Sequence, residues 1–334
     1  MPPFTFIGVP IDSVGRAGGT EHGPAALRKL GLPAALGGPD GGDLAVRIRG
    51  EIRDPATGIL ASDAVLATTT AIRAAVGERI AAGGRPLLAG GCCAELPGAL
   101  AGARDALGPL GLVNFDGHMD LYDGETSPTG EAADMPVSVA LGLGPAGWVA
   151  TAGGASVGPG QLSLLGFRDR EESVEAGMRQ PETLDPRPLV HPVEAVRSDP
   201  GGTGAEVAAA LAGAGPFWLH FDVDALDQAA FPATDYLMSG GLAWPEVDAA
   251  LAALAASPRL VGVSLGCYNP EKDPGAACGR RLVELLGGAL GASAPGERRT
   301  KRSKDAGRPN SSAIWPTEDA APRRVRRRRA QNSS

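Results

Sequence analysis

Two acidic clusters, each placed directly after an apolar run, limit the folds open to this chain more than any other feature of its sequence. The first cluster, Asp-Gly-His-Met-Asp at residues 116–120, follows the apolar run 110–115. The second, Asp-Val-Asp at residues 222–224, follows the apolar run 217–221. Both runs predict buried strands. Because side chains alternate along a strand, the acids of each cluster are expected to share one side.

Four carboxylates and one imidazole at the ends of two strands would repel each other and lose hydration unless a positive charge lay between them. The set Asp116, His118, Asp120, Asp222 and Asp224 therefore predicts a divalent metal site. It has too many donors for one ion with an open position, and it suits two ions that share carboxylates. The alternative is two solvated turns whose acids bind no metal.

The remaining pattern predicts one α/β domain with helices on both faces of a parallel sheet, because strand and helix signals alternate along the chain. Ser62 is expected to cap a long helix at its N-terminus, and residues 34–60 are expected to be irregular. Since apolar residues make up 43% of the chain but aromatic residues only 4%, Ala, Leu and Val must fill the core. Ligands of such sheets bind beyond the carboxyl ends of the strands, where both clusters fall. Besides the two runs above, strands are expected at residues 4–9, 86–89, 162–167 and 260–265.

The sequence indicates neither membrane anchoring nor secretion. No apolar run is long enough to cross a bilayer, and the first residues lack the basic and apolar regions of a signal peptide. We therefore expect a cytoplasmic protein that does not contact a membrane. Its four cysteines, Cys92, Cys93, Cys267 and Cys278, are then expected to be free thiols or metal ligands rather than disulfides.

The overall charge of −7 combines two parts of opposite sign. Residues 292–334 hold 12 basic and 4 acidic residues, a net charge of +8, so the preceding part carries a net charge of −15. This tail is poor in apolar residues and carries an arginine run at 323–329, a composition typical of disorder. Weak contact with nucleic acid is one role for such a run, and an extension without function is the alternative.

Three motifs, in chain order, resemble the metal motifs of the arginase/agmatinase/formimidoylglutamase (ureohydrolase) family. They are Gly90-Gly91-Cys92-Cys93, Asp116-Gly117-His118-Met119-Asp120 and His220-Phe221-Asp222-Val223-Asp224. The stretches 8–28 and 231–234 also resemble family segments, so the resemblance covers about residues 4–290. It implies a three-layer α/β/α fold over residues 1–291 with a mainly parallel eight-stranded sheet, usually assembled into homo-oligomers, either trimers or hexamers.

The resemblance also implies a role for each matched residue. Asp116 and Asp222 match carboxylates shared by two manganese ions, His118 and Asp224 match ligands of one ion, and Cys93 and Asp120 match ligands of the other. The implied reaction is hydrolysis of a linear amidine or guanidine C–N bond by water activated between the ions. Asp120, with Glu131 on the loop that follows, is expected to orient this water and pass its proton to the leaving amine.

Three positions depart from the family's pattern. Cys93 replaces the histidine that ends the first motif, and its sulfur makes zinc or iron(II) alternatives to manganese. A small buried thiol without a ligand role is the other interpretation of Cys93. Ala133 stands where arginase has a histidine that shuttles protons. Cys267 stands where the family has a glutamate that holds the guanidinium.

These departures point away from plain arginine as the substrate. A small guanidino or amidino compound is expected instead, of the N-hydroxyarginine, agmatine or formimino type. The residues expected to contact it are Tyr122, Ser127, Thr129 and Cys267, with Glu131 or Asp134 as the carboxylate partner. The alternative function is that of a catalytically degenerate protein that keeps the fold and binds metal.

The other histidines are expected to lie outside the metal site. His22 and His191 fall near prolines in predicted loops and are expected at the surface. His220 is expected to face away from Asp222, where it would pack in the core or make a hydrogen bond behind the ligands.

Overall fold

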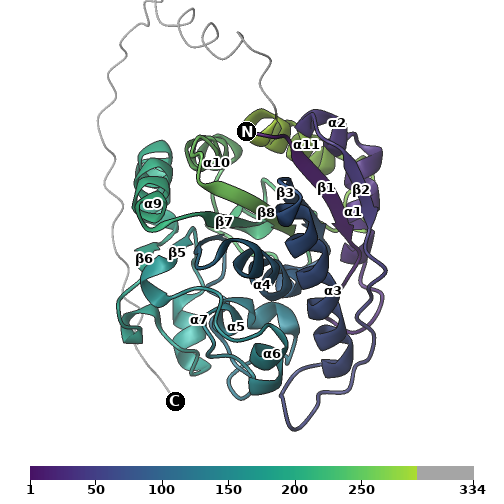
Figure 1. Ribbon diagram of the computed structural model, residues 1–334, viewed down its shortest axis with the longest axis vertical. Helices are drawn as coiled ribbons and strands as arrows, with labels where there is room; N and C mark the ends of the chain where they lie inside the picture. Colours follow the sequence, from purple (N-terminus) through teal and green to yellow (C-terminus); the bar gives the residue numbers. More distant parts are fainter. Residues whose placement is uncertain (292–334) are drawn as a thin grey trace, which may run out of the picture. The chain divides into compact units, whose positions relative to one another are not determined.

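The computed structural model describes residues 1–291, and its centre is one eight-stranded sheet in which every neighbouring pair of strands is parallel (Figure 1). In spatial order the strands are β2 (Asp40–Asp43), β1 (Phe4–Val9), β3 (Arg85–Gly90), β8 (Leu260–Gly266), β7 (Phe217–Asp222), β4 (Gly111–Phe115), β5 (Leu162–Leu165) and β6 (Leu189–His191). The predicted parallel eight-stranded sheet is therefore confirmed.

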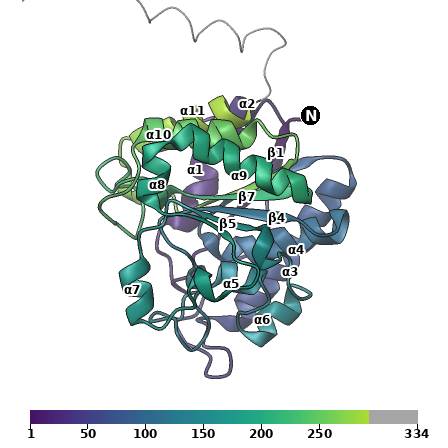
Figure 2. The same ribbon diagram turned by 90° about the vertical axis from the view of Figure 1, so that its left-hand side faces the viewer.

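Helices cover both faces of this sheet, as the two perpendicular views show (Figure 1, Figure 2). On one face lie α1 (Gly23–Lys29), α2 (Leu32–Leu36), α8 (Val193–Ser198), α9 (Pro200–Ala214), α10 (Trp244–Ala255) and α11 (Ala277–Leu290). On the other face lie α3 (Ser62–Ala81), α4 (Leu96–Leu107), α5 (Pro136–Ala140) and α6 (Ala146–Thr151). The short helix α7 (Arg170–Glu175) follows β5. One apolar core lies under each helical layer, which confirms the three-layer α/β/α prediction.

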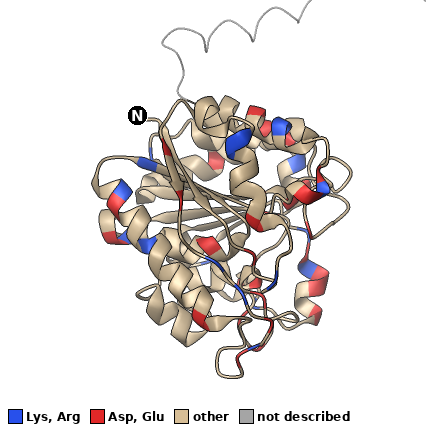
Figure 3. Ribbon diagram, turned by 90° about the vertical axis from the view of Figure 1, so that its right-hand side faces the viewer, with Lys and Arg blue, Asp and Glu red and all other residues tan. Residues whose placement is uncertain are grey.

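The central strands are mainly apolar because both of their faces are covered. β4 and β7 are buried along their whole length. Phe115 and Phe221, at their ends, pack with ring centres 5.6 Å apart. Charged residues lie mainly on the surrounding helices and loops (Figure 3). Polar residues at the carboxyl ends of these strands therefore stand out against an apolar interior.

Residues 34–60 are less irregular than predicted, because they contain the end of α2 and the edge strand β2. The sequence of β2, Asp-Gly-Gly-Asp, has low strand propensity and no alternation. Pairing with β1 holds this strand, as does Arg28, which donates to Asp40 at 2.7 Å and to Asp43 at 2.6 Å. Tertiary partners thus create a strand that the local sequence does not indicate.

The N-terminal cap predicted at Ser62 is wrong. Ala61, with a left-handed φ of 49°, precedes α3, and Ser62 is the first helical residue. The Ser62 hydroxyl instead accepts a hydrogen bond from Thr57 at 3.1 Å. The start of α3 is therefore fixed by the turn before it and not by a side-chain cap.

Within residues 1–291, no helix has the length and apolar character needed to cross a membrane. All four cysteines are free thiols. The basic tail predicted at residues 292–334, with its predicted disorder and nucleic-acid contact, lies outside the described residues.

Candidate metal centre

Four neighbouring strands at the centre of the sheet deliver the candidate site. β3, β8, β7 and β4 lie side by side in that order. Cys93 begins the 3₁₀ turn η2 (Cys93–Glu95) after β3, Cys267 follows β8, Asp222 ends β7, and Asp116 follows β4. Because the strands are parallel, these residues meet at one edge of the sheet and line a common pocket.

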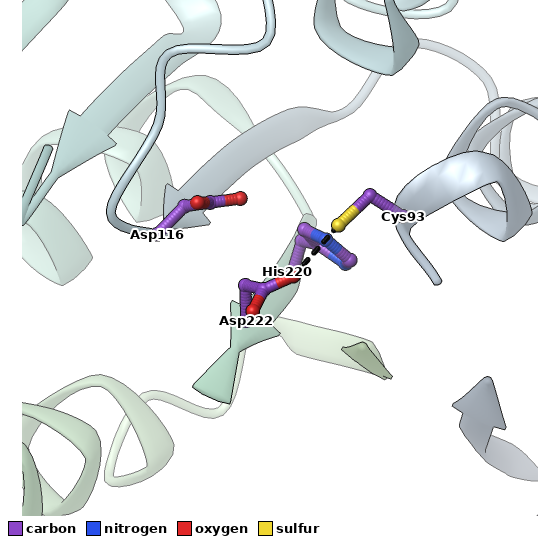
Figure 4. Close-up of side chains that lie close together, drawn as sticks. All are labelled: Cys93, Asp116, His220 and Asp222. Atoms are coloured by element: carbon purple, nitrogen blue, oxygen red, sulfur yellow. Dashed lines mark hydrogen bonds between the residues drawn. The ribbon is translucent and has the colours of Figure 1, made fainter. Parts of the chain in front are cut away.

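Two groups of donor atoms form at this edge, and Asp116 belongs to both. In the sulfur group, Cys93 Sγ, a ring nitrogen of His220 and carboxylate oxygens of Asp116 and Asp222 all lie within 4.8 Å of one another. In the oxygen group, a ring nitrogen of His118 and carboxylate oxygens of Asp116 and Asp224 meet the same limit. Figure 4 shows Cys93 and Asp116 approaching Asp222 and His220 from opposite sides. The arrangement offers two adjacent cation positions joined by one carboxylate.

Backbone N–H groups fix one oxygen of each carboxylate in these groups. Asp116 Oδ1 accepts from the N–H of His118 at 2.7 Å, Asp222 Oδ1 from that of Asp224 at 2.9 Å, and Asp224 Oδ1 from that of Gly117 at 2.9 Å. Among the described residues, however, Asp116 Oδ2 and Asp120 Oδ2 are buried without a hydrogen-bond partner. A buried carboxylate oxygen without a hydrogen-bond donor destabilises the folded protein. A bound cation would give these oxygens a partner, so the residues present fit a metal ion.

Burial and like charges both raise the pKa values of the carboxylates at the site. Burial, followed by the charges of Asp224 and Asp222, raises the pKa of Asp116 well above its usual range. Burial and the charge of Asp116 do the same to the pKa of Asp120. Burial and the charge of Asp224 raise the pKa of Asp222 to about 6. A divalent ion would relieve this repulsion, because an opposite charge favours the ionised carboxylates.

Within the described part of the chain, His118 is the only basic side chain that lines the pocket. Its Nδ1 lies 2.9 Å from Asp224 Oδ2 and 3.6 Å from Asp116 Oδ1. Burial alone would lower the pKa of His118, but the charge of Asp224 and the hydrogen bonds with Asp116 and Asp224 together outweigh burial and raise that pKa. In return, although burial would raise the pKa of Asp224, the His118 charge and the hydrogen bonds from His118 and Gly117 together lower it to about 2. One imidazolium thus partly replaces the charge that bound metal would bring, and metal ligation would release its proton.

Cys93 completes the sulfur group at short range. Its Sγ donates to Asp222 Oδ2 at 2.8 Å and lies 3.7 Å from Cys267 Sγ. The hydrogen bond with Cys267, then burial, raises the pKa of the Cys93 thiol well above its usual value. The thiol therefore stays protonated until a cation displaces the proton, and its position fits a ligand role.

The structure brings several residues with predicted catalytic or substrate roles to the pocket wall, among them Asp120, Tyr122, Glu131 and Cys267. Asp120 has a left-handed φ of 54°, and its carboxylate lies outside both donor groups. Glu131 accepts a hydrogen bond from Ser13 Oγ at 3.4 Å, and burial raises the pKa of Glu131. These placements leave room for Asp120 and Glu131 to act beside the ligands.

Ser127 and Thr129, predicted to contact substrate, are not among the residues that line the pocket. Their hydroxyls donate to Asp134 Oδ2 at 2.5 Å and 2.7 Å. They hold Asp134, which does line the pocket together with Ala133. A direct contact between these two hydroxyls and substrate stays a prediction.

The prediction that His220 faces away from Asp222 is wrong. The two residues stand two positions apart on β7 and share one face, so the period of the strand is the signal that finds His220. Its Nδ1 lies 2.7 Å from Ser264 Oγ, and burial lowers the pKa of His220 to about 4, which keeps the ring neutral. Of the other histidines, His22 is exposed, as predicted. The prediction that His191 lies in a surface loop is wrong, because His191 ends the edge strand β6 and is half-buried.

Arg53 anchors the loop that leads to Glu131. Its guanidinium donates to the carbonyl oxygens of Gly58, Gly124 and Ser127 at 2.8, 3.1 and 2.9 Å. We expect Arg53→Ala to lower the free energy of unfolding by about 2–4 kcal/mol, because three carbonyls lose a charged donor. Arg53→Lys, which keeps the charge but not the fork, should lose less. Urea denaturation measures both variants, and equal stability of Arg53→Ala and the unaltered protein would contradict this role.

Comparison with known proteins shows which sequence family the described domain matches. Residues 3–288 match the sequence profile of the arginase family. The chain is 26% identical over 307 residues to the arginase of Bacillus caldovelox, which covers 87% of this chain and 99% of that protein. It is 30% identical over 210 residues to the N(omega)-hydroxy-L-arginine amidinohydrolase of Streptomyces lavendulae, which covers 62% of this chain and 68% of that protein. The solved structure of the Bacillus caldovelox arginase superposes with a TM-score of 0.77 at 25% identity, over 88% of this chain and 99% of that chain.

Proposed function

This chain belongs to the arginase family, and on that premise we propose that it is a metal-dependent hydrolase of linear guanidine or amidine C–N bonds. Members of the family are hydrolases that act on C–N bonds. The observation that carries the proposal is the pair of donor groups that share Asp116. Two ions joined by a carboxylate are the arrangement that a binuclear hydrolase uses.

The proposed ligands follow the family motifs. Asp116 and Asp222 are assigned as shared carboxylates, His118 and Asp224 as ligands of one ion, and Cys93 and Asp120 as ligands of the other. The donor groups support Asp116 as the shared residue and contain the other ligands except Asp120, so the role of Asp120 and the sharing of Asp222 rest on the motifs alone. Manganese is the first expectation, with zinc or iron(II) as alternatives where Cys93 binds. Two divalent ions held there would supply the charge that lowers the pKa of a water molecule and stabilises developing negative charge.

Asp120 is the residue we assign to orient the attacking water. Its Oδ2 is buried without a partner among the described residues, and burial raises its pKa, so the carboxylate can take up a proton. Glu131, whose pKa burial also raises, would pass a proton to the leaving amine from the pocket wall. Ala133 carries no titratable group, which is why proton transfer falls to these two carboxylates.

The charge of the pocket favours a cationic substrate. Asp12, Glu131, Asp134 and Asp235 line it besides the proposed ligands, and no Lys or Arg occurs among its described lining residues. Such a wall attracts a guanidinium and repels an acid, so an acidic formimino compound fits poorly. Asp12 Oδ2 is buried without a hydrogen-bond partner among residues 1–291. An agmatine-like substrate, with a second cationic group, would provide the missing donor.

A screen for urea and ammonia release tests the function. The manganese-loaded protein is incubated with agmatine, N-hydroxyarginine, arginine and an acidic formimino compound. We expect agmatine or N-hydroxyarginine to be turned over more than about tenfold faster than the acidic compound, because one missing charge pairing in a pocket costs at least that factor. Faster turnover of the acidic compound would contradict the charge argument.

A catalytically degenerate metal-binding protein is the second candidate function. Ala133 and Cys267, which supply neither a proton shuttle nor a carboxylate, favour it. Both candidates bind metal, but only the hydrolase releases urea or ammonia. Absence of release from every compound, with two ions bound per chain, would select the degenerate candidate.

Two further properties are proposed on family grounds alone. They are assembly into a homo-oligomer, either a trimer or a hexamer, and action on small molecules in the cytoplasm.

A further inference from the structure

The two donor groups that share Asp116 differ in their chemistry. The sulfur group brings Cys93 and His220 to the carboxylates of Asp116 and Asp222, whereas the oxygen group brings one imidazole to two carboxylates. Thiolate and imidazole ligands suit zinc, while sites rich in carboxylate suit manganese. The centre therefore offers a soft position next to a hard one.

Ser264 and Trp218 hold the His220 ring in place. Trp218 Nε1 donates to Ser264 Oγ at 3.0 Å, and Ser264 Oγ lies 2.7 Å from His220 Nδ1. All three side chains are fully buried, and His220 Nε2 has no hydrogen-bond partner among residues 1–291. A metal-binding histidine commonly donates its second ring N–H to a fixed acceptor. The tautomer in which Nδ1–H donates to Ser264 would leave the lone pair of Nε2 free for a metal.

Sulfur is concentrated on the same side of the centre. Cys93 Sγ lies 2.8 Å from Asp222 Oδ2 and 3.7 Å from Cys267 Sγ. Both sulfurs line the pocket, whereas His118 and Asp224 contact each other on the side of the oxygen group. Each group thus holds one imidazole and two carboxylates, and the sulfur of Cys93 is what makes one position softer than the other.

We propose that this centre holds two different ions, zinc in the sulfur group with His220 as its imidazole ligand, and manganese in the oxygen group. The inference rests on the proposed function only in assuming a binuclear centre. Zinc would displace the proton of the Cys93 thiol, and His220 Nε2 would supply the nitrogen ligand.

Competitive loading tests the proposal on the full-length protein. Metal-free protein receives one equivalent of zinc with excess manganese, and elemental analysis follows desalting. One zinc and one manganese per chain are expected. Loss of a residue that only orients a metal ligand already lowers metal affinity about 10–100-fold. Loss of the ligand itself in His220→Ala should therefore weaken zinc binding at least about a hundredfold and leave manganese bound. Cys278→Ser, the matched control on a cysteine outside the pocket, should keep zinc, and unchanged zinc affinity in folded His220→Ala would overturn the assignment.

A second readout needs no variant and covers the case in which His220→Ala does not fold. One equivalent of zinc should slow alkylation of Cys93 at least about tenfold, since the bound thiolate is withdrawn from reaction, and manganese alone, which binds thiolate more weakly, should slow it less. Peptide mapping separates Cys93 from Cys278, which lies outside the pocket and serves as the internal reference. Equal alkylation of Cys93 with and without zinc would overturn the proposal.

The outcomes separate this inference from the proposed function. Two manganese ions bound in the presence of one equivalent of zinc, together with C–N hydrolysis, would overturn the mixed centre and leave the hydrolase intact. The expected zinc and manganese without any hydrolysis would support the mixed centre and remove the hydrolase.

Discussion

Replacing Asp116 with Asn should lower C–N hydrolysis at least about a thousandfold, because the shared carboxylate supports both ions that activate the water. Asp116 is the one residue common to both donor groups. Asn keeps the size and the Oδ1 acceptor that binds the His118 N–H, so the turn after β4 should survive. It removes the charge that joins the groups, and bound metal should fall from two ions per chain to no more than one.

Elemental analysis and rate measurements on Asp116→Asn should be paired with Asp63→Asn. Asp63 is an exposed carboxylate on α3, far in the sequence from every motif. The control should keep both metal and rate. If Asp116→Asn retained two ions and full activity, the shared role of this carboxylate would be wrong.

Replacing Cys267 with Glu should raise turnover of guanidino substrates by about 30- to 1,000-fold, the equivalent of a charge-assisted hydrogen bond of about 2–4 kcal/mol in a closed site. Cys267 lines the pocket beside Cys93, at the position where the resemblance places a guanidinium-binding carboxylate. It already has a left-handed φ of 70°, so Glu meets the same backbone constraint as the native residue. Unaltered protein should accordingly turn over arginine slowly.

The matched control is Cys267→Gln, which has the size of Glu but no charge. It should show no gain, because recognition of a guanidinium needs the carboxylate. Steady-state rates with arginine and agmatine separate the variants. Efficient urea release from arginine by the unaltered protein would show that another carboxylate, such as Glu131 or Asp134, already holds the guanidinium.

The strands that carry the site were predictable because their runs are mainly apolar and end abruptly in acids. A run such as Gly111–Phe115 fits only the covered interior of a parallel sheet, and that fold brings the acids to one edge. β2 was not predictable, because pairing with β1 and the bonds from Arg28 create it against its local propensity. Edge strands of this kind depend on partners that the local sequence does not show.

The residues of the site were predictable only in part, because some are found only from the strand period and others come together only through contacts between distant parts of the sequence. Short sequence motifs identify Asp116, His118, Asp222 and Asp224. His220 is found only by noting that it lies two residues before Asp222 on β7 and therefore shares its face of the strand. Contacts across long separations carry no local signal. Cys93 and Cys267 lie 174 residues apart in sequence and 3.7 Å apart in space. The acidic wall formed by Asp12 and Asp235 likewise exists only after folding.

The most direct test of the binuclear centre is the number of divalent ions bound per chain in the unaltered protein. Metal-free protein is loaded with manganese at neutral pH, with and without one equivalent of zinc, desalted and analysed for metal against protein concentration. Two ions per chain are expected in both cases, since the two donor groups exist side by side before any metal is added. A protein that returns no bound ion after loading would contradict the metal centre, and with it the proposed hydrolysis.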